Sequence, residues 1–137
     1  MIQIYSDGVA VAAGGTYPLN TAVFFKGSTA TQNAVGSVGA NTRGVYNVHV
    51  DGYATLADAG VYSIQLTRNG VPLPQAISSM NVAAGEIGSG SFDTLIVVEE
   101  SNCSCDWTSV ATSLGVINPS ESDITEGHIN IIVSKLI

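Results

Sequence analysis

Two segments that begin with Gly-Val-Tyr, followed by an Asn-Gly pair, constrain the fold of this chain more than any other feature. The segments cover residues 44–51 and 60–67, and Asn69-Gly70 comes directly after the second. In the first, Tyr46, Val48 and Val50 alternate with polar residues. Alternation of this kind is typical of a strand with one buried face, and Asn-Gly is a preferred two-residue hairpin turn. The pattern predicts antiparallel sheet, with the two Gly-Val-Tyr strands as neighbours.

The rest of the chain fits the same class of fold. Turn residues separate eight to ten short strand-like segments, and none has convincing helical periodicity. Residues 20–26 and 92–99 are apolar on both faces of a strand, which suits a central strand or one that a partner covers. Prolines 72 and 74 cannot donate to the ladder, so their segment is expected at a sheet edge, or its strand begins after Pro74. The Gly/Ser-rich residues 86–91 predict a loop, and residues 128–136 predict a last strand. This spacing favours an all-β antiparallel sandwich or jelly roll.

The length of 137 residues indicates one domain. We expect residues 1–18 to form a short N-terminal arm or edge hairpin, and residues 19–137 to form the jelly-roll domain.

Charge and composition exclude several classes of function. The chain has a formal net charge of −7 and only 11% charged residues, against about 25% in a typical soluble domain. Its four basic residues are scattered, whereas a nucleic-acid surface needs them clustered. No apolar run is long enough for a spanning helix, and the first fifteen residues do not resemble a signal peptide. We therefore expect no nucleic acid and no membrane insertion. The chain would stay in the cytoplasm where it is made, or leave it by lysis or within a particle.

The order of these features resembles the C1q/TNF-like jelly roll. The resemblance rests on the opener Gly44-Val45-Tyr46, the strand that runs into Asn69-Gly70, and the aliphatic closing strand over residues 129–136. It covers residues 43–137, and no collagen-like stalk precedes them. The front segment TYPLNTAVFFKG, residues 16–27, is similar to small tailed-phage proteins that decorate the capsid or form head fibres.

The resemblance implies a homotrimer with no enzymatic activity, displayed on a bacteriophage virion with capsid or fibre proteins as partners. The alternative is a C1q-like bacterial surface domain, or a phage receptor-binding head that recognises cell-surface glycans. We expect the trimer core among apolar residues of the two-faced strands, the first Gly-Val-Tyr strand and the C-terminal strand. These residues are Phe24, Phe25, Tyr46, Phe92, Ile96, Ile129, Ile131 and Val133.

Few residues suggest chemistry. Cys103 and Cys105 supply two soft ligands, but tetrahedral zinc needs four. Cys103, Cys105 and Trp107 could instead line a ligand loop, since exposed Trp often contacts sugars. His49 and His128 lie on the polar phase of their strands, where we expect partly exposed imidazoles with cross-strand hydrogen bonds. The loosely clustered acids after residue 99 predict solvated loops, with a weak surface calcium site as the alternative. We therefore expect no catalytic residue, no cofactor and no metal site.

Overall fold

The computed structural model describes residues 1–27, 30–32, 36–99 and 112–137, and this part of the chain forms ten strands and no helix. None of it could therefore cross a membrane as a helix. The prediction of an all-β chain is confirmed. The strands are β1 (Ile2–Val11), β2 (Thr21–Phe25), β3 (Ala30–Gln32), β4 (Val38–Ala40), β5 (Gly44–Thr55), β6 (Gly60–Arg68), β7 (Val71–Val82), β8 (Ile87–Val98), β9 (Thr112–Ile117) and β10 (Ile124–Lys135).

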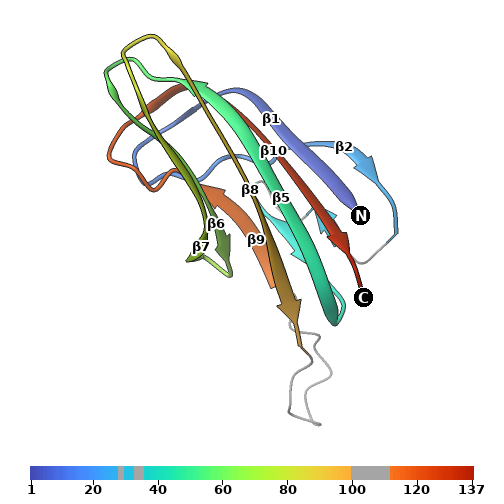
Figure 1. Ribbon diagram of the computed structural model, residues 1–137. Helices are drawn as coiled ribbons and strands as arrows, with labels where there is room; N and C mark the ends of the chain where they lie inside the picture. The colour runs from blue at the N-terminus through green and yellow to red at the C-terminus, as the bar shows by residue number, and fades with distance from the viewer. Residues whose placement is uncertain (28–29, 33–35, 100–111) are drawn as a thin grey trace.

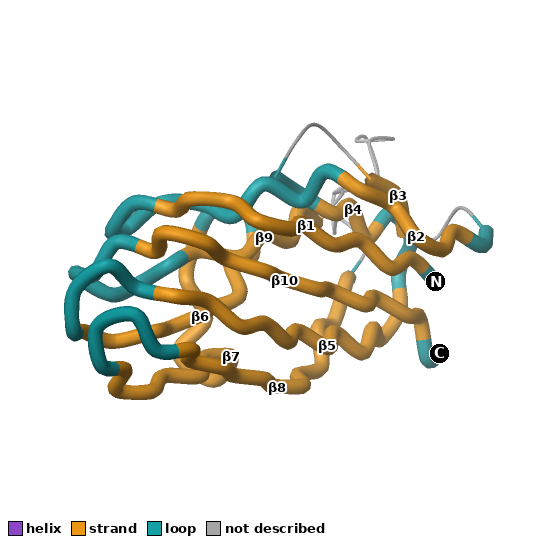
Figure 2. The backbone as a smooth tube through the Cα atoms, turned by 90° about the horizontal axis from the view of Figure 1, so that it is seen from above, coloured by secondary structure: helices purple, strands orange, loops and turns teal. Residues whose placement is uncertain are grey.

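The strands form two five-stranded antiparallel sheets that pack face to face (Figures 1 and 2). Sheet A has the order β2-β1-β10-β5-β8, and sheet B has the order β3-β4-β9-β6-β7. Alternate residues of both sheets point inwards and form one core, as expected of a sandwich. The two chain ends lie beside each other at one end of the sandwich (Figure 2).

The N-terminal strand belongs to the body of the sandwich. β1 lies between β2 and β10 and pairs with both, and Ile2 and Ile4 are fully buried in the core. This part of residues 1–18 therefore forms neither the expected arm nor an edge hairpin, but a single strand inside sheet A. Alternation within so short a segment shows that a strand has a buried face, but it does not show which strands flank it.

The two Gly-Val-Tyr segments also need a correction, because they form β5 and β6 and lie in opposite sheets. β5 pairs with β10 and β8, whereas β6 pairs with β7 and β9. Residues 56–59 carry the chain from one sheet to the other. The buried Tyr46 and Tyr62 therefore enter the core from opposite sides.

The predicted hairpin is confirmed. Asn69 and Gly70 have φ angles of 51° and 82°, and Arg68 pairs with Val71 across them. Positive φ at both central residues matches the type I′ turn that Asn-Gly favours. β7, which carries both prolines, is the edge strand of sheet B, as predicted.

Residues 86–91 form the start of β8 and not the predicted loop, except for Glu86. A Cβ atom on Gly88 would lie 2.5 Å from Val82 Cγ2 and 2.9 Å from Tyr62 Cβ. Position 88 therefore requires glycine because the backbone of β8 comes close to the other sheet here. A Gly/Ser-rich composition alone does not distinguish such a strand from a loop.

Candidate functional site

The solvent-facing side of sheet A is the candidate functional surface. We call it the open face and define it by the outward residues of four strands. These are the odd-numbered residues 3–7 of β1, 45–53 of β5 and 87–97 of β8, and the even-numbered residues 126–134 of β10. Sequence and register give this face four carboxylates, two imidazoles and no lysine or arginine.

Most of the residues expected at a trimer interface do not lie on this face. Tyr46, Ile96, Ile129, Ile131 and Val133 are at most 2% exposed and pack in the core between the two sheets. Their placement at an interface is wrong, because the apolar phase of each strand is covered by the chain's own second sheet. The strands that carry these five residues, β5, β8 and β10, all belong to sheet A, and the other alternate residues of these strands face solvent.

The remaining predicted residues have different outcomes. Phe92 is partly buried against the core. The side chains of Phe24 and Phe25 lie outside the described part of the chain, as do Cys103, Cys105 and Trp107. The predicted ligand loop therefore stays a prediction.

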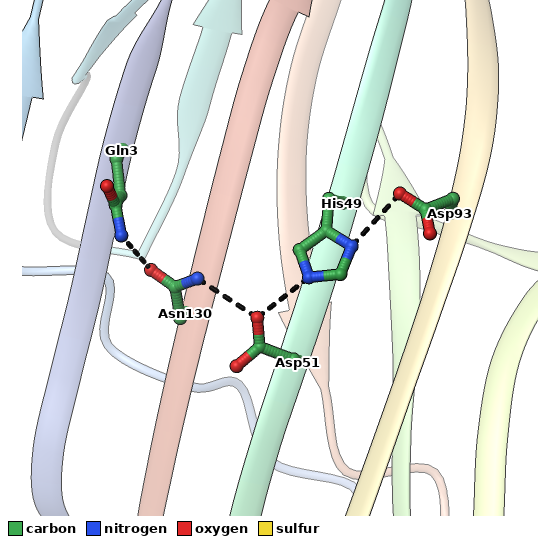
Figure 3. A network of polar contacts seen from close by, with 5 residues as sticks. All are labelled: Gln3, His49, Asp51, Asp93 and Asn130. Atoms are coloured by element: carbon green, nitrogen blue, oxygen red, sulfur yellow. Dashed lines mark hydrogen bonds and ion pairs between the residues drawn. The ribbon is translucent and has the colours of Figure 1, made fainter.

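A row of polar side chains crosses four strands of the open face (Figure 3). Gln3 Nε2 of β1 donates to Asn130 Oδ1 of β10 at 2.9 Å, and Asn130 Nδ2 donates to Asp51 Oδ2 of β5 at 3.1 Å. His49 completes the row, with Nε2 2.8 Å from Asp51 Oδ2 and Nδ1 2.9 Å from Asp93 Oδ1 of β8. The amides, the imidazole and the carboxylates of this row thus find hydrogen-bond partners within one chain.

The geometry around His49 specifies its protonation state. Both ring nitrogens face carboxylate oxygens, so both bonds form only when both nitrogens carry a proton. Partial burial lowers the pKa of His49, but the hydrogen bonds and negative charges of Asp51 and Asp93 outweigh this effect. They raise the pKa above its ordinary value of 6.5. The cross-strand hydrogen bond predicted for this residue is confirmed.

His128 of β10 forms a second cluster of the same kind. Its Nδ1 contacts Asp7 of β1, and its Nε2 lies 3.8 Å from Glu126 Oε1. The β1 ladder is irregular between Ser6 and Val9, and a bulge next to Asp7 is a common way to redirect a side chain. Tyr53 stacks on the imidazole with ring centroids 4.2 Å apart.

A shallow pocket of about 300 Å³ lies beside this second cluster. Residues of β1, β5 and β10 line it, among them Tyr5, Asp7, Asp51, Tyr53 and His128. Two exposed tyrosine rings and several hydrogen-bonding groups thus meet in one hollow of the open face.

The end of the open face near the C-terminus is apolar. Leu95 and Val97 of β8 are 58% and 47% exposed, and Val97 pairs with Val45 of β5. Leu136 follows β10, donates its backbone N–H to Val45 and is also exposed. The open face therefore combines a polar centre with an uncovered aliphatic end.

Part of this site could be predicted from the sequence. His49 and Asp51 are two residues apart on a predicted strand, which places them on one face. Gln3, Asn130 and Asp93 come from distant parts of the chain, and only the register of β1, β10 and β8 brings them to the same row.

No protein-family model and no curated protein matches the sequence of this chain. Solved structures do match its fold. The globular domain of zebrafish complement 1qA protein has a TM-score of 0.70 and 8% identity, over 99% of this chain and 96% of that chain. The PRD1 vertex protein P5 has a TM-score of 0.66 and 12% identity, over 99% and 96%. Eiger TNF from S. frugiperda also has a TM-score of 0.66, with 13% identity over 99% and 92%.

These neighbours cover the whole chain at low identity, so they establish its architecture. The fold is a C1q/TNF-like jelly roll, as the resemblance implied, and it is shared with a vertex protein of PRD1.

Proposed function

We propose that this protein is a non-enzymatic structural component of a tailed-phage virion, and that it assembles as a homotrimer through the open face of sheet A. The observation that carries the proposal is the composition of this face. Its polar centre is hydrogen-bonded within the chain, and its aliphatic end is uncovered.

The internal hydrogen bonds matter because burying an unpaired polar group costs free energy. Gln3, Asn130 and His49 already have partners in one chain, so a second copy can cover them without leaving these groups unpaired. Leu95, Val97 and Leu136 supply apolar area whose burial favours association. A face with these two properties suits contact between copies better than permanent exposure to water.

A structural role is supported by the surroundings of His49. Both ring nitrogens of His49 are engaged by carboxylates, so the ring has no free nitrogen with which to activate a nucleophile. The likeness to the PRD1 vertex protein P5 concerns the fold, and it supports a place on the capsid or in a head fibre as the class of location to test first.

The oligomeric state is tested by sedimentation velocity or light scattering at micromolar concentration. We expect three times the chain mass of 14.0 kDa for the wild type. Leu95→Asp should give the mass of one chain, because it places a charge at the centre of the apolar end. Val71→Asp is the matched control, since Val71 is 63% exposed on β7 of the other sheet. A wild type that is monomeric under these conditions contradicts the proposal.

The virion location has its own test. Particles of the phage that encodes the protein should contain it after purification, and an antibody against it should label intact particles. Absence of the protein from purified particles contradicts this half of the proposal and leaves the trimer unaffected.

The pocket beside His128 favours one second candidate, a bacterial surface or receptor-binding head that recognises glycans. Exposed Tyr5 and Tyr53 offer rings on which a sugar can stack, and Asp7, Asp51 and Asn130 offer hydrogen-bonding groups. A glycan array with the wild type, Tyr53→Ala and Trp107→Ala tests this candidate. Binding that depends on Tyr53 would show that the open face stays accessible, which is incompatible with its burial in a trimer.

A further inference from the structure

Both histidines of the chain lie on the open face, and each lies between two carboxylates. Asp51 and Asp93 contact the two nitrogens of His49, at 2.8 Å and 2.9 Å. Asp7 contacts Nδ1 of His128, and Glu126 lies 3.8 Å from Nε2. All four carboxylates of the open face belong to these two clusters. The carboxylates of the open face are therefore grouped around its two imidazoles.

The protonation of His49 halves the negative charge of its cluster. With the ring neutral, Asp51 and Asp93 give the cluster a charge of −2. With the ring protonated, the charge is −1. None of the described outward residues of the open face is basic. Arg68 of sheet B donates to the Val97 carbonyl at the apolar end of the face, and Lys26, Arg43 and Lys135 lie at strand ends.

Contact between two copies brings two such faces together. Like charges then repel, and each carboxylate that loses water without a partner adds a desolvation cost. A protonated His49 gives both Asp51 and Asp93 a charged hydrogen-bond donor, so the cluster enters the contact with a net charge of −1 instead of −2 and with both carboxylates hydrogen-bonded. A neutral His49 leaves one of these carboxylates facing a nitrogen lone pair.

We propose that self-association through the open face is linked to proton uptake at His49, so that assembly is strong at mildly acidic pH and weakens above neutrality. This inference rests on the proposed function, because its partner is a second copy of this chain. It adds a regulated step to an assembly that is otherwise held by apolar burial.

The groups around each ring support the direction of the effect. His49 faces Asp51 on its own strand and Asp93 on β8, while β10 presents Asn130 and Ile132, which do not titrate. His128 faces Asp7 and Tyr5 from β1, Tyr53 from β5 and Glu126 from its own strand. Carboxylates and phenols do not normally titrate between pH 5.5 and 8.5, so the neighbours of His49 add no comparable change of charge in this window.

The test measures assembly by sedimentation velocity across a concentration series at pH 5.5, 7 and 8.5. For the wild type we expect the concentration of half-assembly to rise at least about tenfold from pH 5.5 to 8.5. In a trimer this requires a pKa shift on assembly of only about 0.7 units in one titrating group per chain. His49→Gln keeps hydrogen-bonding capacity without titrating. It should reduce this pH dependence by more than half.

A charge-matched pair of variants checks the mechanism. Asp93→Asn removes one carboxylate from the His49 cluster and should strengthen assembly at pH 8.5. Asp58→Asn removes the same charge from an exposed turn away from the open face, and should leave assembly unchanged. Equal effects of the two substitutions would overturn the inference, since net charge alone would then explain them.

The ring resonances of His49 give a second measurement that does not depend on the folding of any His49 variant. Their titration midpoint should be higher in the assembled wild type than in monomeric Leu95→Asp. Equal midpoints, or half-assembly of the wild type at one concentration throughout the pH range, would overturn the inference and leave the trimer intact. A wild type that is monomeric at every pH would instead refute the proposed function itself.

Discussion

At the scale of single residues, the His49 cluster should make the stability of one subunit depend on pH. The pKa of His49 is raised in the folded chain, so folding favours the protonated ring. The stabilisation is fully present below about pH 6.5 and is lost as pH rises through the higher folded pKa. Because the side chains of His49 and Asp93 are 31% and 63% exposed, we expect at most about 1 kcal/mol.

Urea unfolding of His49→Gln in the monomeric Leu95→Asp background measures this effect without assembly. The loss of stability should be visible at pH 5.5 and close to zero at pH 8.5. A larger loss at pH 8.5 than at pH 5.5 would contradict the sign.

Two buried tyrosines provide a second prediction at the same scale. The hydroxyls of Tyr17 and Tyr62 are buried in the core, where each interacts with the other but neither has a hydrogen-bond partner of good geometry. Burial raises the pKa of both phenols far above the usual value. Removing an unpaired buried hydroxyl removes a desolvation cost, so Tyr62→Phe should be neutral or stabilising by up to about 1 kcal/mol. Tyr46→Phe is the control, because Tyr46 Oη donates to the Thr42 carbonyl at 2.7 Å. Calorimetry should show a lower Tm for Tyr46→Phe alone.

At the scale of elements, the glycines of β8 should be essential for the approach of the two sheets. Gly88→Ala places a Cβ 2.5 Å from Val82 Cγ2 and 2.9 Å from Tyr62 Cβ. Overpacking of this kind usually costs about 1–3 kcal/mol. Val82→Ala in the same chain should recover part of that loss, since it removes the nearer contact. Chemical unfolding of the single and double variants measures the coupling, and additive losses would contradict this account.

The same strands show how far the sequence determines the fold. Because side chains alternate along a strand, the sequence pattern predicts that Tyr46, Val48 and Val50 share a buried face, and all three are fully buried. The turn at Asn69-Gly70 was predictable because its chemistry is local. The position of β1 inside sheet A was not, because pairing depends on contacts between residues more than a hundred positions apart. The polar row from Gln3 to Asp93 depends on the same long-range register. Its residues can be read from the sequence, but their contacts with one another cannot be predicted from it.

At the scale of the whole molecule, the open face of sheet A is the contact surface of the proposed trimer, and the two ends of this face differ in character, since one of them is aliphatic. β1 is held between two strands, so Ile2–Val11 is part of the sandwich and is not a free tether. The aliphatic end with Leu95 and Val97 lies at the end of the sandwich where the chain terminates (Figure 1). Assembly through this end would leave the opposite loops pointing away from it.

If three chains unfold together to monomers, thermal stability should depend on protein concentration. A domain of this length has an unfolding enthalpy of roughly 95 kcal/mol per chain, so a tenfold increase in concentration should raise Tm by about 3 °C. Differential scanning calorimetry at pH 6 checks this for the wild type. Val71→Asp should show the same dependence, whereas Leu95→Asp should unfold at one Tm at all concentrations. A wild-type Tm that does not change with concentration would mean that the subunit folds and unfolds alone, and that the open face holds no partner under these conditions.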